Sequence, residues 1–264
     1  MTQTLYQYNA ADIADIARQA RIHILEAVAH AKGGHVGGPY SAAEMLAALY
    51  FRVLNIRPEE PDWPDRDRFV LSKGHSSIAL YAILAMRGYF PVEELLTFDS
   101  IDSRLQGHPD MTVTPGVDMS SGSLGLGFAG ALGMALGARA MQKKFMTYVM
   151  LGDGECNEGI VWEGAHVANR YGLDNLIAIV DHNKLQQFGW RVLEVDGHDV
   201  QAFLDTIDQA RAAKGSPIAV IAHTIKGKGV SYMEGDYTWH SKVPTEEEFA
   251  IAMEELGANE GGAV

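Results

Sequence analysis

Cysteine is almost absent from this 264-residue chain, and long apolar runs are missing altogether. The single cysteine, Cys156, excludes an internal disulfide and agrees with a reducing compartment. No apolar run approaches the roughly 18 residues that a membrane span needs. Residues 1–10 contain no basic stretch followed by an apolar core, which a signal peptide would require. We therefore expect a cytoplasmic protein without a membrane anchor.

Positive charge is also scarce. The chain has 21 Lys and Arg against 34 Asp and Glu, a formal net charge of −13, and no basic run. This balance argues against nucleic-acid binding and against docking on an anionic membrane. With 47% hydrophobic residues, the chain can bury one large core. We expect a single domain over residues 1–264, with an N-terminal helical segment.

Strands and helices are expected to alternate along the chain. Short apolar runs predict strands, and apolar residues at helical spacing predict helices between them. The pattern predicts an α/β fold, a doubly wound, mostly parallel sheet with helices on both faces, in which ligands bind beyond the carboxyl ends of the strands. The expected strands are residues 69–71, 147–151, 176–180, 192–195 and 217–224, and the expected helices are residues 11–32, 45–54, 76–87, 128–141, 159–170 and 200–214.

Two segments are expected to be irregular. Residues 34–39 are too rich in glycine for a helix, and Ser41 with Glu44 has the pattern of a capping box that begins the next helix. Residues 99–127 lack periodicity but are too apolar and glycine-punctuated to be disordered. Long irregular segments inside a compact domain are usually functional.

The Gly152-Asp153-Gly154 turn follows a predicted strand and could hold a divalent cation with a diphosphate. Mg²⁺ prefers oxygen ligands, which the Asp153 carboxylate, the Asn183 amide and the Leu185 backbone carbonyl could supply. The flanking glycines would let backbone N–H groups approach phosphate oxygens near a helix N-terminus. An ordinary strand-to-helix turn would read the same way from the sequence.

Four histidines, His35, His75, His108 and His240, lie in irregular segments rather than on helix faces. Imidazoles can bind phosphate, hydrogen-bond sugar hydroxyls and transfer protons near pH 7. A lone histidine is more often structural, but four beside a diphosphate site favour a functional role. Of the others, His23, His30 and His166 are interpreted as structural, whereas His182, His198 and His223 stay undecided.

Together these motifs resemble the transketolase family. The resemblance covers residues 13–244, and Val36 and Ser123 look like the split bacterial forms, in which the enzyme is divided between two chains. The motifs stand in the family's order: Gly34-His35, Asp65-Arg66-Asp67-Arg68, Ser72-Lys73-Gly74-His75, Gly107-His108-Pro109, Ser121-Gly122-Ser123-Leu124-Gly125, Gly152-Asp153-Gly154 with Glu158, Asp181-His182-Asn183-Lys184 and Lys226-Gly227-Lys228-Gly229.

The resemblance implies a site for thiamine diphosphate and Mg²⁺. Asp153, Asn183 and the Leu185 carbonyl would ligate the ion. Three groups would hold the cofactor diphosphate, and one backbone segment would meet its aminopyrimidine ring. The residues that would hold the diphosphate are Gly154, His75 and His240, and the segment that would meet the ring is Gly122, Ser123 and Leu124.

The resemblance also implies roles in the reaction, which is reversible transfer of a two-carbon ketol unit from a ketose to an aldose acceptor. His35, His108 and His240 would bind sugar hydroxyls and relay protons, with sugar phosphates as the default substrates. Glu158 matches a family glutamate that couples the protons of two active sites. Its alternative role is to complement the dipole at a helix N-terminus.

A second chain is implied as well. In transketolases, the glutamate that activates the cofactor and the arginines that hold the sugar phosphate lie on a further α/β domain. The resemblance therefore implies a catalytically silent chain that acts with a C-terminal transketolase subunit, in an α2β2 heterotetramer.

Three other functions remain open from the sequence. A 2-oxo acid dehydrogenase of the two-chain type would share Gly152-Asp153-Gly154 and Asn183 in its alpha chain, but we would not expect it to carry His35, His75 and His108. A deoxyxylulose-phosphate synthase would be a longer single chain. A non-catalytic regulatory paralogue would not need Asp153 and Asn183 intact.

The connection between residues 180 and 192 is unexpectedly short. The flanking strands should be parallel neighbours, and a parallel crossover needs about a dozen residues or more. The family has roughly 20 further residues here. Either the sequence omits a segment near Gln186 and Gln187, or the chain carries a true deletion, which would count against a complete cofactor site. Cα–Cα spacing across residues 185–188 would distinguish the two.

Overall fold

Three parallel strands form the centre of the first part of the molecule. The computed structural model describes residues 8–181, 191–212, 218–223, 225, 227–236, 238 and 244–255. It divides into two units, Met1–Phe188 and Gly189–Val264, which are described separately. In the first unit the strands lie in the order β1 (Arg68–Leu71), β2 (Thr147–Gly152) and β3 (Leu176–Asp181). The register pairs Leu71 with Met150 and Gly152 with Asp181, so the carboxyl ends of the strands meet at one edge.

Alternating residues of β1 and β2 face opposite sides of this sheet. Phe69 and Met150 belong to one buried apolar cluster, whereas Val70, Val149 and Leu151 belong to another. Side chains of a strand alternate with a period of two, and a parallel sheet is normally covered on both faces. The doubly wound arrangement expected from the sequence is therefore present in this unit.

Helices α1 (Ala10–Ala31), α2 (Gly37–Ala48) and α3 (Ser77–Arg87) contribute to the cluster on the first face. Helix α1 begins at a capping box, in which Asn9 accepts from the backbone N–H of Asp12 while Asp12 accepts from that of Asn9. Arg21 on α1 donates both guanidinium arms to Glu44 on α2, which joins the two helices.

The start of α2 differs from expectation. We predicted an irregular segment over residues 34–39 and a helix start at Ser41, but α2 begins at Gly37. Ser41 therefore lies inside the helix, where its hydroxyl contacts the Gly38 carbonyl at 3.0 Å and the Asp181 carboxylate at 2.5 Å. Tertiary contacts of Ser41 override its local capping preference. Helix α2 runs on into a π-helical turn, Leu49–Val53.

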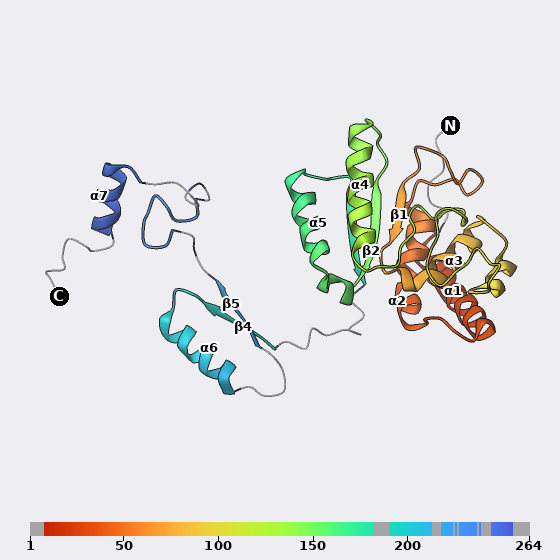
Figure 1. Ribbon diagram of the computed structural model, residues 1–264, viewed down its shortest axis with the longest axis horizontal. Coiled ribbons are helices and arrows are strands. Elements are labelled where there is room, and N and C mark those ends of the chain that lie inside the picture. The colour runs from red at the N-terminus through yellow and green to blue at the C-terminus, as the bar shows by residue number, and fades with distance from the viewer. Residues whose placement is uncertain are drawn as a thin grey trace. The chain divides into compact units, whose positions relative to one another are not determined.

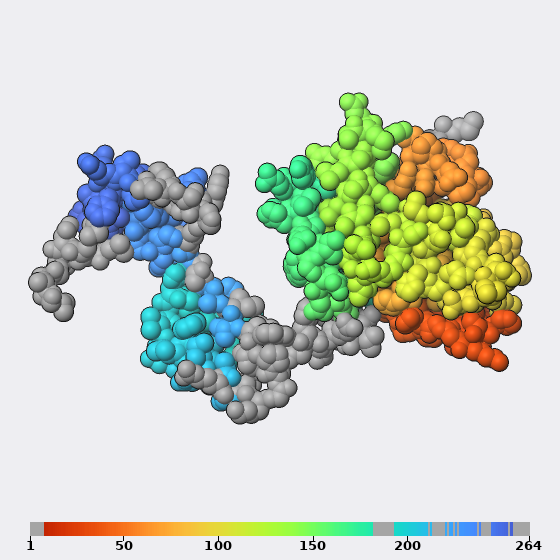
Figure 2. Space-filling view, viewed as in Figure 1, coloured from red at the N-terminus to blue at the C-terminus, as the bar shows by residue number. Residues whose placement is uncertain are grey.

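Helices α4 (Leu126–Ala140) and α5 (Gly159–Arg170) supply the cluster on the second face, against Val70, Val149 and Leu151. Figure 1 shows both helices (green) on the side of the strands away from α1. In the space-filling view, the red, orange, yellow and green segments of this unit pack into one body (Figure 2). The first unit therefore has two apolar layers separated by the sheet.

The second unit contains the parallel pair β4 (Arg191–Asp196) and β5 (Ile218–His223), joined by α6 (Val200–Ala212) (Figure 1). It also contains α7 (Glu246–Glu255), which we did not predict. A capping box starts this helix, because the Thr245 N–H donates to the Glu248 carboxylate and the Glu248 N–H donates to the Thr245 hydroxyl. Shorter 3₁₀ turns span Gly74–Ser76, Val92–Thr97 and Gly154–Asn157.

Two expectations are not tested by this structure. Residues 182–190, and with them the Cα spacing across 185–188, lie outside the described residues. Strands β3 and β4 belong to the two separately described units, so their pairing, and the single domain over residues 1–264, stay predictions.

Candidate cofactor site

The ends of β1, β2 and β3 bring together three motifs from distant parts of the sequence. Because these strands are parallel, the Ser72–His75 segment, the Gly152-Asp153-Gly154 turn and Asp181 all lie at the carboxyl edge of the sheet. The Asp153 N–H donates to the Asp181 carbonyl at 3.2 Å, which joins the ends of β2 and β3. This is the edge at which doubly wound sheets bind ligands.

Asp153 is mostly buried, with 9% of its surface exposed. One carboxylate oxygen accepts from the backbone N–H of Gly154 at 2.9 Å. The pKa of the neighbouring Cys156 thiol is raised by burial and then by the negative charges of Glu155 and Asp153. The turn therefore carries concentrated negative charge, which favours a bound cation.

Three of the predicted histidines approach one another. The ring centroids of His35 and His75 are 5.2 Å apart. Burial lowers the pKa of half-buried His75, and nearby His35, Lys73 and His108 lower it further. A Cβ atom at Gly122 would lie 3.6 Å from Cδ2 of His108, so the predicted aminopyrimidine segment is close to this group as well.

Glycine permits a close approach at two positions of this edge. A Cβ atom at Gly74 would lie 2.8 Å from the Ser121 carbonyl oxygen, and one at Gly127 would lie 2.6 Å from Cα of Ser72. The Ser121 hydroxyl donates to the Leu71 carbonyl at 2.6 Å. The Ser121–Leu124 loop is therefore packed directly on the end of β1.

A buried ion pair, which sequence reasoning missed, lies beneath these loops. The Lys73 ammonium, whose side chain is 1% exposed, contacts the Asp181 carboxylate and donates to the Gly38 carbonyl at 3.0 Å. Lysine is almost never fully buried unless it is paired. The pair links α2 to the ends of β1 and β3, and no local sequence signal could have identified its partner 108 residues away.

Glu158 is exposed and occupies the N-cap position of α5. Its side chain makes no capping hydrogen bond, and its Cβ lies 3.2 Å from where a Cβ of Gly125 would stand. Sequence reasoning did not single out the nearby Glu155, whose buried carboxylate accepts hydrogen bonds from several loops. Asn183, Leu185 and His240 lie outside the described residues, so the structure does not bear on their predicted roles.

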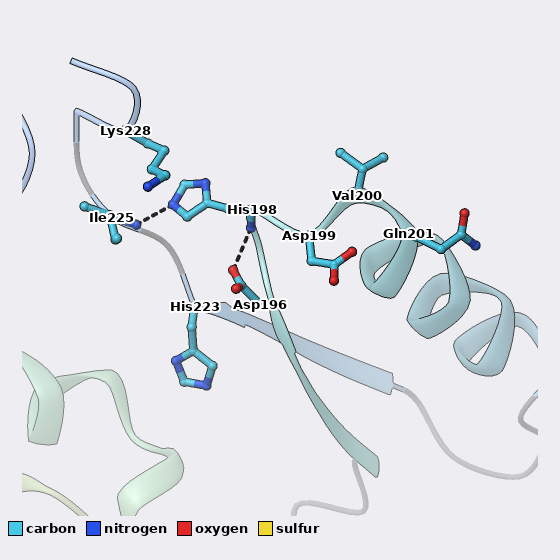
Figure 3. A pocket seen from close by; sticks show the side chains of 8 residues that line it. All are labelled: Asp196, His198, Asp199, Val200, Gln201, His223, Ile225 and Lys228. Atoms are coloured by element: carbon cyan, nitrogen blue, oxygen red, sulfur yellow. Dashed lines mark hydrogen bonds between the residues drawn. The ribbon is translucent and has the colours of Figure 1, made fainter. Parts of the chain in front are cut away.

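The undecided histidines of the second unit line a pocket of about 940 Å³ (Figure 3). His198 Nε2 accepts the Ile225 N–H at 2.6 Å, and His223 Nε2 lies 3.1 Å from the Glu194 carboxylate. Lys228 also lines the pocket and forms an ion pair with Glu234 at 3.2 Å. The partners of these three side chains therefore all belong to the second unit.

The residues at the sheet edge suit a diphosphate with its cation. Asp153 offers a carboxylate to the ion, and the Gly154 turn and His75 offer N–H donors to phosphate. In addition, the Ser76 hydroxyl beside this loop is buried and has no hydrogen-bond partner among the residues that the structure describes. Among the described residues, no group of three or more His, Cys, Asp and Glu side chains could hold a metal by itself.

Sequence comparison decides the family. The model of the transketolase, thiamine diphosphate binding domain family matches residues 13–262. The chain belongs to this family. The match confirms the predicted transketolase and favours it over a 2-oxo acid dehydrogenase.

Proteins named as transketolase subunits are among its relatives. The chain is 43% identical to the 6-deoxy-6-sulfo-D-fructose transketolase subunit SqwG of a Clostridium strain, covering 92% of this chain and 96% of the relative. It is 40% identical to one subunit of the apulose-4-phosphate transketolase of Phocaeicola vulgatus, covering 89% and 90%. The alignment with the Clostridium subunit is 264 positions long. It includes 92% of this chain, which is about 243 residues, so this chain has a gap at about 21 of the aligned positions.

Solved transketolases share the fold. The enzyme from Leishmania mexicana superposes with a TM-score of 0.63 at 32% identity, over 93% of this transketolase chain. The enzyme from Campylobacter jejuni gives 0.63 at 30% identity, over 95% of it. The predicted α/β fold is thereby confirmed. The chain spans 41% and 43% of these two proteins. No helix in the described ranges has the length and apolar character to cross a membrane.

Proposed function

We propose that the chain is the diphosphate-binding subunit of a two-chain, thiamine-diphosphate-dependent transketolase that works with Mg²⁺ in the cytoplasm. The observation that carries the proposal is the convergence of Asp153, His75 and the Ser121–Leu124 loop at one sheet edge, in a chain of this family. Two similar proteins are named as subunits and are matched over 90% or more of their length, which supports a partner chain.

Each described residue would have a task set by its position. Asp153 would ligate Mg²⁺ with Asn183 and the Leu185 carbonyl, while Gly154 and His75 would hold the diphosphate. The backbone of Gly122, Ser123 and Leu124 would orient the ring. When bound, thiamine diphosphate supplies the carbanion chemistry that ketol transfer needs.

The substrate-facing groups would be His35 and His108, together with His240. Their imidazoles can donate to sugar hydroxyls and accept protons from them. Glu158, exposed beside Gly125, would couple this site to a second one in an α2β2 assembly.

We further propose that the donor is a ketose with an anionic terminal group. One relative is named for a sulfonated ketose and the other for a ketose phosphate, so a terminal anion is the feature that their substrates share. A sugar phosphate is the default. A sulfonate should be assayed beside it, since both present tetrahedral anionic oxygens.

The test is to purify the chain, add the C-terminal transketolase subunit, and assay ketol transfer with ketose phosphates and sulfonates, thiamine diphosphate and Mg²⁺. We expect no turnover by the chain alone and robust turnover by the complex.

Asp153→Ala should abolish Mg²⁺-dependent cofactor binding measured by calorimetry, because only neutral protein ligands would remain for the ion. Turnover by the chain alone, or unchanged cofactor affinity of Asp153→Ala, would refute the proposal.

A further inference from the structure

Glu155 has no role in the site described above, yet it is the most enclosed carboxylate at this edge. It lies two residues after Asp153, in the Gly154–Asn157 turn, and is 2% exposed. No ion pair of Glu155 occurs among the described residues. A buried carboxylate without a cation is costly unless hydrogen bonds stabilise it.

Three backbone or hydroxyl donors supply that stabilisation. Glu155 Oε1 accepts from the Ser72 hydroxyl and from the Gly125 N–H at 2.7 Å. Oε2 accepts from the Gly152 N–H at 3.1 Å. The donors come from the end of β1, the loop before α4 and the end of β2. One side chain therefore joins the three segments that carry His75, Gly122–Leu124 and Asp153.

The same contacts complete the N-terminus of α4. The N-cap residue, Gly125, has no side chain with which to cap the helix. Ser72 Oγ instead accepts from the Phe128 N–H at 3.1 Å, while its own hydrogen is donated to Glu155. A hydroxyl has only one hydrogen to donate, so Ser72 relays the orientation of Glu155 to the helix. A carboxylate near a helix N-terminus is also favourable.

We propose that Glu155 is a positioning residue. It holds three segments in the geometry that receives the cofactor: the diphosphate-binding turn at Gly152–Gly154, the segment Ser72–His75 and the aminopyrimidine-binding loop at Gly122–Leu124. The proposal rests on the proposed function. Loops held in place before binding lose less conformational freedom when a ligand binds, which raises affinity. Glu155 would act through these three segments and not through contact with the cofactor.

Glu155→Gln is the decisive variant, because it keeps the shape of the side chain but replaces one acceptor oxygen by a donor. Both carboxylate oxygens accept hydrogen bonds, so an amide must turn N–H toward a donor in either orientation. We expect thiamine diphosphate with Mg²⁺ to bind the assembled complex about tenfold to hundredfold more weakly by calorimetry. The rate at saturating cofactor should fall much less than the affinity. Glu93→Gln, at an exposed glutamate, is the matched control and should leave affinity unchanged.

The outcomes are distinguishable. A wild-type complex that fails to bind the cofactor refutes the proposed function, whereas a folded Glu155→Gln complex with wild-type affinity overturns the positioning role alone. A merely structural role would lower the melting temperature without changing affinity below it. If Glu155→Gln does not fold, Ser72→Ala decides, because it removes one donor and keeps the carboxylate. Unchanged affinity in Ser72→Ala would then overturn the proposal.

Discussion

At the residue scale, the site depends on buried charges that hold loops rather than touch a ligand. The side chains of Lys73 and Asp181 are 1% and 6% exposed. Ser41 also donates to the Asp181 carboxylate, and Lys73 also donates to the Gly38 carbonyl. Breaking a buried ion pair strands its partner charge in a medium that cannot solvate it. The stability of this edge should therefore respond strongly to one lysine.

We predict that Lys73→Met lowers the free energy of unfolding by about 3–5 kcal/mol, because it removes the cation that pairs with the buried Asp181 carboxylate. Lys143→Met is the matched control. Lys143 pairs with Asp65 at 2.7 Å on the surface, and such pairs contribute at most about 1 kcal/mol. Urea unfolding of the three proteins measures the difference. Equal losses for the two variants would contradict the importance of the buried pair.

His75 should make stability depend on pH. Burial, followed by the neighbours His35, Lys73 and His108, lowers its pKa below the usual 6.5. The unfolded chain then binds a proton more readily than the folded one, so stability falls as pH drops through about 6.5 toward the folded pKa. We predict that His75→Asn removes this part of the pH dependence.

Histidine resonances in NMR would follow the same group directly. Adding thiamine diphosphate and Mg²⁺ should raise the pKa of His75, because a nearby diphosphate favours the charged imidazole. If the His75 resonance titrates identically with and without cofactor, His75 does not lie near the bound diphosphate.

The sequence predicted the chemistry-bearing residues of this site better than the residues that support them. Asp153 and the histidines stand in short motifs, and the parallel strand order brings their motifs to one edge. Lys73 and Glu155 were not identified, because their roles arise from partners 108 and 83 residues away. Such pairings follow from the register of the folded sheet and leave no local pattern.

At the element scale, strands and long helices followed local rules, and their boundaries departed from expectation where tertiary contacts intervened. Strand β2 extends one residue beyond the predicted 147–151, and α5 matches the predicted 159–170. Helix α2 starts early, because Ser41 bonds to Asp181 instead of capping. Helix α7 carries a capping box that could have been found.

Two glycines of α4 test whether the start of this helix is closely packed against the end of β1. A Cβ at Gly127 would lie 2.6 Å from Cα of Ser72, whereas a Cβ at Gly133 meets nothing within 4 Å. We predict that Gly127→Ala destabilises by about 1–3 kcal/mol through overpacking and also weakens cofactor binding. Gly133→Ala should stabilise by roughly 0.5–1 kcal/mol, because alanine is the better helix former. Thermal unfolding of both variants is the measurement, and stabilisation by Gly127→Ala would show that the helix start can move away from β1.

At the scale of the whole molecule, the alignment with the sulfo-sugar transketolase subunit has about 20 positions at which this chain carries no residue. The two described units each have their own parallel strands, and the connection from Asp181 to Arg191 is shorter than a parallel crossover that holds a helix. A doubly wound sheet that continued from β3 into β4 would need that crossover. We therefore place the absent positions here as a prediction.

Grafting the corresponding segment of the sulfo-sugar transketolase relative between Asp181 and Arg191 tests this prediction. If the grafted segment supplies this crossover, β3 and β4 should be neighbours in one sheet, and the grafted chain should unfold in a single cooperative calorimetric transition. The graft should also tighten the binding of thiamine diphosphate with Mg²⁺ in the assembled complex, because the ion's predicted ligands Asn183 and Leu185 lie in this connection. A Gly/Ser insert of equal length is the control, since it restores length without a helix or ligands. If the graft and the control behave alike, the absent positions lie elsewhere in the chain, and β3 and β4 are not joined by this crossover.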